Sequence, residues 1–166
     1  MKRLDYVLEE KLVKIINLGL NRLIRPDIEL SDVTALNKNT IRWLKQRYGI
    51  EGVVIDVDET IRKGDEKLPE CNREWLETLR GELKVVILSN GWSGELEKYF
   101  EEKGIDYIKL AFKPAKRGFR KACESMGLDP SKVIMIGNDT LADIHGGKRS
   151  GLKTARVVSV KEDDER

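Results

Sequence analysis

Five short runs of apolar, β-branched residues recur along the chain, and none of them has a polar face. Strands that are apolar throughout are buried on both faces, as in a parallel sheet covered by helices. Segments with helical periodicity separate the runs, so the sequence predicts an α/β fold with three layers (α/β/α) and a five-stranded, mostly parallel sheet. The expected strands are 52–55, 84–88, 105–110, 132–136 and 154–160, and the expected helices are 70–80, 94–103, 115–126 and 141–150.

The first 48 residues follow a different pattern. Apolar residues from Leu4 to Leu23 fall at helical spacing, and residues 1–48 contain ten Lys and Arg against six Asp and Glu. We expect a helical N-terminal extension over 1–48, the main domain over 49–160 and a frayed acidic tail over 161–166. The basic amphipathic helix either packs on the sheet or binds a membrane surface or a partner.

Bulk properties narrow the class of protein. A chain of 166 residues fits one compact domain, and a net charge of +2 does not favour nucleic acid as the default partner. No apolar run approaches the ~20 residues of a membrane span, and no signal-peptide pattern opens the chain. Cys71 and Cys123 lack metal-binding spacing, which favours reduced thiols and a cytoplasmic location, at a membrane surface if the N-terminal helix binds one.

Two carboxylates directly follow the first expected strand. Alternation along an extended chain turns Asp56 and Asp58 to the same side. Two such carboxylates repel each other unless a cation lies between them, and their oxygens suit Mg²⁺. An acidic turn that merely ends the strand is the plainer alternative, but charges at the end of a buried strand are costly without a purpose. The pair therefore indicates a magnesium site, at the edge where open parallel sheets bind ligands.

Three further polar clusters follow later strands at the same edge. Ser89-Asn90-Gly91 offers donors and close backbone approach to a phosphoryl oxygen, or is only a helix cap. Lys113 could neutralise a phosphoryl group, or is one more surface lysine. The segment 137–143 adds oxygen ligands and at the same time suits a helix N-terminus. Each cluster is ambiguous alone, but four in order at successive strand ends indicate phosphoryl chemistry.

With these four clusters the chain resembles the haloacid dehalogenase-like (HAD) superfamily. The superfamily's DxDxT pattern matches residues 56–60, its second motif Ser89, its third Lys113 and its fourth the segment 137–143. Within the superfamily the chain is similar to the YqeG-type group, class IIIA. The residues that carry this similarity are Arg25-Pro26-Asp27, Gly49-Ile50-Glu51-Gly52-Val53-Val54, Lys113-Pro114 and Asp143-Ile144-His145-Gly146-Gly147. The resemblance covers residues 23–160 and implies a Rossmann-like catalytic domain and a Mg²⁺-dependent phosphomonoester hydrolase.

The resemblance also implies a role for each motif residue. Asp56 is expected to attack phosphorus and become an aspartyl-phosphate, while Asp58 protonates the leaving group and then activates water. Thr60 and Ser89 are expected to position the phosphoryl group and the loop, and Lys113 is expected to hold the nucleophile and the phosphate together. An acid at position 58 separates the phosphatases from the dehalogenases and some mutases of the superfamily, which favours hydrolysis. The expected substrate-binding residues are Ser89, Asn90, Gly91 and Lys113.

The fourth motif departs from the superfamily pattern, in which Asp often follows the glycine. Here Asn138 stands at that position and Asp139 follows it. Either Asn138 binds Mg²⁺ through its neutral amide oxygen, or the turn shifts and Asp139 binds it. The expected metal ligands are therefore Asp56, Asp58 and one of these two residues, and the loss of a negative ligand should weaken the affinity for the cation.

The spacing between the motifs leaves no room for a cap domain. Only about 23 residues separate Thr60 from the second strand, and the segment between Ser89 and Lys113 has room for one helix and one strand. We therefore expect an open site, which suits a large or surface-presented substrate, or a lid that a second subunit of a homodimer supplies.

The sequence leaves the substrate open. The YqeG-type group is similar to mitochondrial and plastid phosphatases that act on phosphatidylglycerophosphate, and an uncapped site with a basic amphipathic helix is consistent with a phospholipid headgroup. Both features are equally consistent with a small soluble phosphorylated metabolite or nucleotide. A non-catalytic binding module is the contrasting class, but all the charged catalytic positions except that of Asn138 are filled.

Overall fold

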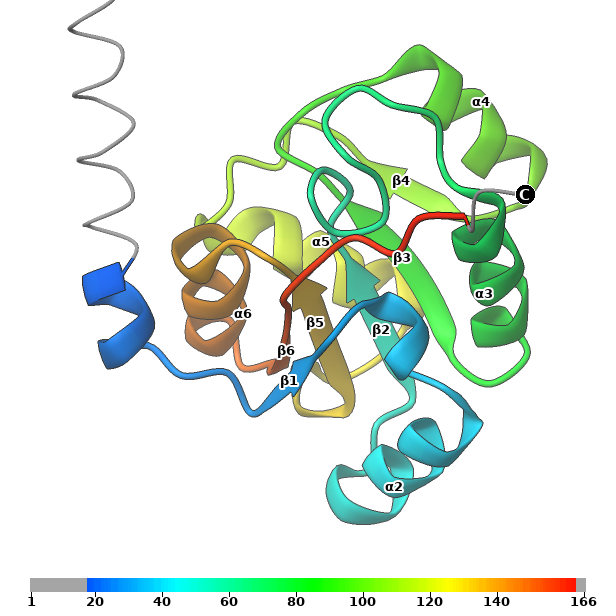
Figure 1. Ribbon diagram of the computed structural model, residues 1–166. Helices are drawn as coiled ribbons and strands as arrows, with labels where there is room; N and C mark the ends of the chain where they lie inside the picture. The colour runs from blue at the N-terminus through cyan, green and yellow to red at the C-terminus, as the bar shows by residue number, and fades with distance from the viewer. Residues whose placement is uncertain (1–17, 164–166) are drawn as a thin grey trace, which may run out of the picture.

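A six-stranded parallel sheet organises residues 18–163, the part of the chain that the computed structural model describes (Figure 1). The strands lie in the order β1-β6-β5-β2-β3-β4, and every neighbouring pair is parallel. The expected α/β fold is therefore confirmed. The strands are β1 (Ile28–Leu30), β2 (Gly52–Ile55), β3 (Lys84–Leu88), β4 (Asp106–Ile108), β5 (Val133–Gly137) and β6 (Lys153–Val157).

The sheet has six strands, one more than the sequence predicts. The additional strand, β1, lies inside the segment 1–48 and pairs with β6 at the edge of the sheet. It has three residues, Ile-Glu-Leu, and so lacks the apolar run that marks the other strands. Asp27 docks it, because its carboxylate accepts hydrogen bonds from the backbone N–H and the hydroxyl of Thr154, at 2.9 and 3.1 Å.

Helices cover both faces of the sheet, and the central strands supply side chains to two cores. Val53 and Ile55 of β2 pack in the core that contains α3 and α4, whereas Val54 packs in the core that contains α5. All four residues of β2 are buried, as expected for the middle layer of three. The helical elements are η1 (Val33–Ala35), α2 (Lys38–Tyr48), α3 (Glu70–Arg80), α4 (Gly94–Glu102), α5 (Lys116–Met126), η2 (Pro130–Lys132), the π-helical turn η3 (Thr140–His145) and α6 (Gly146–Arg149).

Residues 18–23 are helical and begin the described structure. Asn21 ties this helix to the sheet, because its Oδ1 accepts hydrogen bonds from Arg156 Nη1 at 2.9 Å and from the hydroxyl of Thr140. The predicted stripe from Leu4 to Ile16 lies outside the described residues, and its packing stays a prediction. Within residues 18–163 no helix is long and apolar enough to cross a bilayer.

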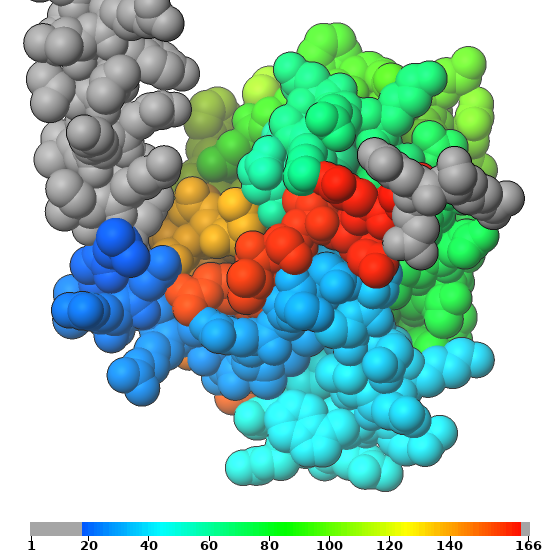
Figure 2. Space-filling view, in the orientation of Figure 1, coloured from blue at the N-terminus to red at the C-terminus, as the bar shows by residue number. Residues whose placement is uncertain are grey.

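The C-terminal segment is anchored further than the sequence predicts. Figure 2 shows it in red between the loop after β2 and the N-terminal strand, where the backbone of Ser159 bonds to Ser31 and Glu162 pairs with Lys63. The carboxylate of Asp163 accepts hydrogen bonds from the first two N–H groups of α3, both at 2.8 Å. Asp163 therefore caps a helix whose own N-cap, a proline, makes no side-chain bond.

The strand register gathers the sequence motifs at one edge of the sheet. Ile55, the last residue of β2, lies opposite Ile87 of β3 and Ile136 of β5, so the three strands end within one residue of the same level. The residues that follow these strands therefore meet. Between β2 and β3 the chain has only α3, and between β3 and β5 it has α4, β4, α5 and the short η2. No cap domain therefore covers this edge within residues 18–163.

Candidate active site

Asp56 follows β2 at the middle of this edge, and its carboxylate is held in one orientation. Its N–H donates to the carbonyl of Ile136 at 2.9 Å, as if the strand continued. Oδ1 accepts a hydrogen bond from Lys113 Nζ at 2.7 Å, and Oδ2 accepts one from Thr60 Oγ1 at 3.2 Å. Asp56 and Thr60 are both buried. The first and third motifs of the sequence therefore meet at this carboxylate.

Lys113 is a buried cation between two carboxylates. Its Nζ lies 2.7 Å from Oδ1 of Asp56 and 2.6 Å from Oδ1 of Asp143, and it donates to the carbonyl of Leu88 at 2.9 Å. Burial lowers the pKa of Lys113, but the charges of Asp143 and Asp56 outweigh it and raise the pKa above its ordinary value. The lysine is charged and neutralises only one of its partners. Accordingly burial, and then the charge of Asp56, raises the pKa of Asp143 to about 7.

Gly137 makes room for Asp143. A Cβ at position 137 would lie 2.2 Å from Oδ2 of Asp143, so a larger residue would displace the carboxylate. The same oxygen accepts a hydrogen bond from the N–H of Asp139 at 3.0 Å. The end of β5 and the π-helical turn η3 thus fix Asp143 behind Lys113.

Asp58 is turned by Arg62 and does not pair with Asp56. Both Nε and Nη2 of Arg62 contact Oδ1 of Asp58, at 3.1 and 3.0 Å, and the guanidinium side chain is only 9% exposed. The other oxygen, Oδ2, points toward the loop after β3, because a Cβ at Gly91 would lie 3.4 Å from it. Asp58 is half-buried and offers this second oxygen to whatever binds between the two loops.

The loop after β3 supplies the hydroxyl group of Ser89 and an amide side chain, Asn90, that holds the Lys113 loop in place. Ser89 is buried, and its Oγ accepts the N–H of Gly91 at 3.1 Å, so its own proton is free to be donated. The role of Asn90 in substrate binding stays a prediction, and the structure shows its side chain bonded to the backbone of Lys113. Its amide donates to the carbonyl of Lys113 at 3.0 Å and accepts from the N–H of Lys113 at 2.6 Å, which fixes the lysine loop.

The two rival residues of the fourth motif point in different directions. Oδ1 of Asn138 lies 3.4 Å from Thr60 Oγ1, the same hydroxyl that bonds to Asp56. Asp139 is exposed and caps η3, since its Oδ1 accepts the N–H groups of Leu141 and Ala142 at 2.9 and 2.7 Å. The turn has therefore not shifted toward Asp139, and Asn138 is the residue placed beside Asp56.

The oxygen atoms around Asp56 fit a hard cation. Oδ2 of Asp56 and Oδ1 of Asn138 converge on one hydroxyl, which has a single proton and cannot satisfy both. Residues 18–163 contain no group of three or more His, Cys, Asp or Glu side chains placed to hold a metal ion. Mg²⁺ takes one or two carboxylates and keeps water and substrate oxygens as its other ligands, so the carboxylate of Asp56 and the amide oxygen of Asn138 suit it.

Two residues of this site are absent from the set expected from the sequence. Asp143 lies within the fourth motif, but in the sequence an acid at that position is explained equally well by the first turn of a helix. The signal that could have found it is the glycine six residues earlier, which its carboxylate requires. Arg62 carried no signal, because one arginine after an acidic turn is common in a chain that is 36% charged.

This arrangement agrees with the comparison with known families. The model of the haloacid dehalogenase-like hydrolases matches residues 7–151. The chain belongs to this family. It is 33% identical over 125 residues to the probable phosphatase YqeG of Bacillus subtilis, a match that covers 73% of this chain and 71% of that protein. The HAD family and its phosphatase-named relatives confirm the expected class, a HAD-type phosphomonoester hydrolase similar to YqeG.

Other relatives share less of their length. The pyrimidine 5'-nucleotidase YjjG of Escherichia coli is 36% identical over 89 residues, which is 48% of this chain and 40% of that enzyme. Among solved structures, a HAD family enzyme from Bacteroides thetaiotaomicron in complex with magnesium and inorganic phosphate aligns with a TM-score of 0.56. It covers 70% of this chain and 98% of that one at 14% identity, and so it supports the fold alone.

Proposed function

We propose that this HAD hydrolase is a Mg²⁺-dependent phosphatase that forms an aspartyl-phosphate on Asp56. The observation that carries the proposal is the fixed carboxylate of Asp56, bonded to Lys113 on one oxygen and to Thr60 on the other. It lies at an edge of the sheet that no cap formed by residues 18–163 covers. Lys113 holds the nucleophile still and would neutralise the charge of an incoming phosphoryl group. Asp143 in turn holds Lys113 in place.

Asp58 and Ser89 complete the proposed machinery. Arg62 fixes one oxygen of Asp58 and leaves the other directed toward Gly91, so Asp58 is placed to protonate the leaving group and later to take a proton from water. The free proton of Ser89 is placed to bond a phosphoryl oxygen. Asn90 serves this site indirectly, by bracing Lys113.

The charge of the site supports a divalent cation. Three carboxylates (Asp56, Asp58, Asp143) face two cations (Lys113, Arg62). Above the pKa of Asp143, which is raised to about 7, all five groups are charged and the formal sum is −1, which would repel a phosphate dianion. Asp56 and Asn138 are the residues that would hold Mg²⁺, which when bound supplies positive charge to the phosphoryl oxygens. Asp58 and Asp139 contribute less, because their carboxylates are engaged by Arg62 and by the N-terminus of η3.

For the substrate, we propose a phospholipid headgroup such as that of phosphatidylglycerophosphate. The open edge supports this substrate, because residues 18–163 form no cap over the site. The rest of a lipid could therefore stay outside while its headgroup reaches Asp56. The alternative is a small soluble phosphorylated metabolite or nucleotide. This alternative is favoured by relatives such as the Escherichia coli enzyme, which is named as a nucleotidase.

The dependence on metal tests this proposal first. Hydrolysis of p-nitrophenyl phosphate is expected to require added Mg²⁺ and to stop in excess chelator, because the site alone repels a dianion. The measurement is the release of p-nitrophenol with and without each reagent, with restoration by fresh Mg²⁺ as the control. Full activity in excess chelator would sink the proposal.

Substitutions in the fourth motif identify its metal ligand. Asn138→Asp is expected to lower the Mg²⁺ concentration that gives half-maximal activity, because it adds a charged oxygen beside Asp56. Asn138→Ala should raise that concentration. Asp139→Asn is the matched control and should leave it nearly unchanged, since Asp139 caps η3. If Asp139→Asn shifts the titration and Asn138→Ala does not, the ligand assignment is wrong.

A further inference from the structure

Exposed apolar side chains gather at the catalytic edge of the sheet. Of the eight large apolar side chains that are most exposed among the described residues, five follow the carboxyl ends of strands β3 to β6. They come from separate loops and are between 43% and 76% exposed. We call them the apolar rim, which consists of Trp92, Leu110, Phe112, Leu141 and Val158.

The rim borders the catalytic residues directly. Trp92 follows Gly91, and Phe112 precedes Lys113. The two loops are joined, because the N–H of Leu110 donates to the carbonyl of Gly91 at 3.3 Å and that of Ala111 to the carbonyl of Ser89 at 2.9 Å. Anything that covers the rim therefore also faces Asp56.

Two residues of the rim are exposed to solvent by a strained backbone conformation. Leu110 and Phe112 have φ values of +49° and +54°, in the left-handed region, which is unfavourable for a residue other than glycine. Their side chains are nevertheless 55% and 76% exposed, so the strain is not offset by burial within residues 18–163. Strained loops that direct apolar groups into water are typical of sites of contact.

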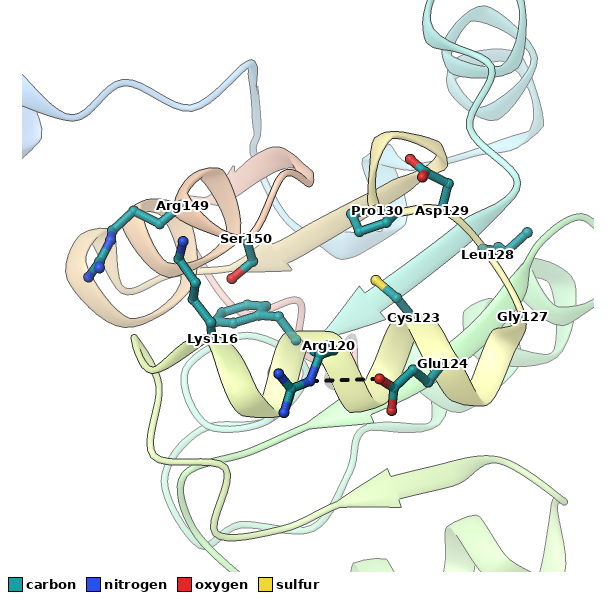
Figure 3. A pocket seen from close by; sticks show the side chains of 11 residues that line it. Lys116, Arg120, Cys123, Glu124, Gly127, Leu128, Asp129, Pro130, Arg149 and Ser150 are labelled. Carbon is teal, nitrogen blue, oxygen red and sulfur yellow. Dashed lines mark ion pairs between the residues drawn. The ribbon is translucent and has the colours of Figure 1, made fainter.

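One part of this edge, the start of α5, carries positive charge. The first turn of α5 begins three residues after Lys113 and holds Lys116 and Arg117, with no acidic residue. Cations at a helix N-terminus are unfavourable unless an anion is nearby. Figure 3 shows Lys116 and Arg149 together at one end of a cavity of about 620 Å³ between α5 and α6. Of the nearby acids, Glu97 is paired with Lys109. The first turn of α4 adds Glu95 and Glu97 to the same edge, so it is the part beside Phe112 and the start of α5 that suits a partner both apolar and anionic.

We propose that the apolar rim and the first turn of α5 dock on a membrane surface that contains anionic lipid, with the catalytic site facing the headgroups. This inference rests on the proposed function and names the surface that presents its substrate. Five side chains that project from separate loops suit an interface that yields to them, and Trp and Phe favour the boundary of the hydrocarbon region. A peptide would need a groove for the same residues. The helix 18–23, with Leu18 and Leu23 exposed, is held at this edge by Asn21.

Vesicle flotation of the full chain tests the proposal. The protein is expected to float with phosphatidylcholine vesicles that contain phosphatidylglycerol, and much less with phosphatidylcholine alone, because Lys116 and Arg117 need anionic headgroups. The double variant Trp92→Gln/Phe112→Asn should lose about tenfold or more in partitioning. Trp43→Gln is the matched control, since Trp43 is 44% exposed on α2, at the opposite edge, and should not change it.

Tryptophan fluorescence locates the contact. Vesicles with phosphatidylglycerol should shift the emission of the wild-type protein to the blue, and quenching by brominated lipid should follow. Both signals should vanish in Trp92→Phe and persist in Trp43→Phe. Unchanged flotation of the double variant, or signals that survive Trp92→Phe, would overturn the proposal in favour of another contact surface.

Hydrolysis of p-nitrophenyl phosphate separates this inference from the proposed function. The rim variants should hydrolyse this soluble substrate like the wild type, because Trp92 and Phe112 take no part in the chemistry. A wild-type enzyme that hydrolyses it but never floats would refute the docking surface and leave the phosphatase intact. A protein that floats but does not hydrolyse p-nitrophenyl phosphate would refute the phosphatase and leave the docking surface intact. A dimer that dissociates in the rim variants, with no flotation, would assign the rim to a second copy of the chain and also refute the proposal.

Discussion

Asp56→Asn is expected to reduce phosphatase turnover to background, a loss on the order of 10⁵–10⁶-fold, as for the removal of other enzymatic nucleophiles. The amide is nearly the same size as the carboxylate but cannot attack phosphorus. Lys113 keeps Asp143 as a partner, so the fold should persist. The measurement is turnover of p-nitrophenyl phosphate at saturating substrate and Mg²⁺, with thermal melting to show that the variant is folded.

The matched control is Asp65→Asn, which removes a fully exposed carboxylate from the same loop region. It should change turnover little. If Asp56→Asn retained a tenth of the wild-type rate while folded, Asp56 would not be the nucleophile, and the proposal would have to be abandoned.

Lys113→Met is expected to damage both stability and activity. The lysine side chain is 1% exposed and lies between Asp56 and Asp143, so its removal leaves two carboxylates near each other without a cation. Breaking a buried ion pair in this way typically costs about 3–5 kcal/mol of unfolding free energy. Activity should fall on the order of 10²–10³-fold, because the fixed positive charge at the phosphoryl site is gone. Denaturant unfolding and initial rates measure the two effects.

A second substitution separates the two roles of Lys113. Lys113→Met/Asp143→Asn should recover much of the lost stability, since one unpaired charge is removed, but none of the activity. An additive loss of stability in the double variant would contradict the pairing described for these residues.

The pH dependence of stability has a definite sign at this site. Burial, and then Asp56, raises the pKa of Asp143 to about 7 from an ordinary value of 3.8, so the folded chain holds a proton that the unfolded chain releases. Through this group, stability is present below pH about 4 and falls as the pH rises to about 7. Because Lys113 lowers the pKa of Asp143, the fall should extend to higher pH without this lysine.

Much of the fold could be predicted from residue patterns, because long apolar runs and helical periodicity were sufficient. β2, β3 and α3 have the predicted bounds. β1 could not be predicted, since its three residues are held by pairing with β6 and by Asp27, which depend on residues over a hundred positions away. The contact of Asp163 with the start of α3 could not be predicted either, because it also joins residues far apart in the sequence.

The residue types of the site could be predicted from the sequence, but the orientations of their side chains could not. Alternation places Asp56 and Asp58 on one side of an extended chain, yet the turn after Val57 lets Arg62 draw Asp58 away from Asp56. The choice between Asn138 and Asp139 depends on which of them caps η3, a geometric detail that the sequence leaves open. The comparison with relatives adds the family but not these orientations.

The most direct measurement is to look for the phosphoryl group on Asp56 itself. Asp58→Asn should turn over about 10²–10⁴-fold more slowly than the wild type, because it lacks the acid and base while the nucleophile is intact. Mixed with substrate and Mg²⁺ and then quenched in acid, this variant should show the mass of one phosphoryl group on the peptide that contains Asp56. Asp56→Asn/Asp58→Asn should show none. A phosphoryl group on another residue, or substrate hydrolysed by Asp58→Asn with no phosphorylated enzyme detected, would contradict the aspartyl-phosphate mechanism.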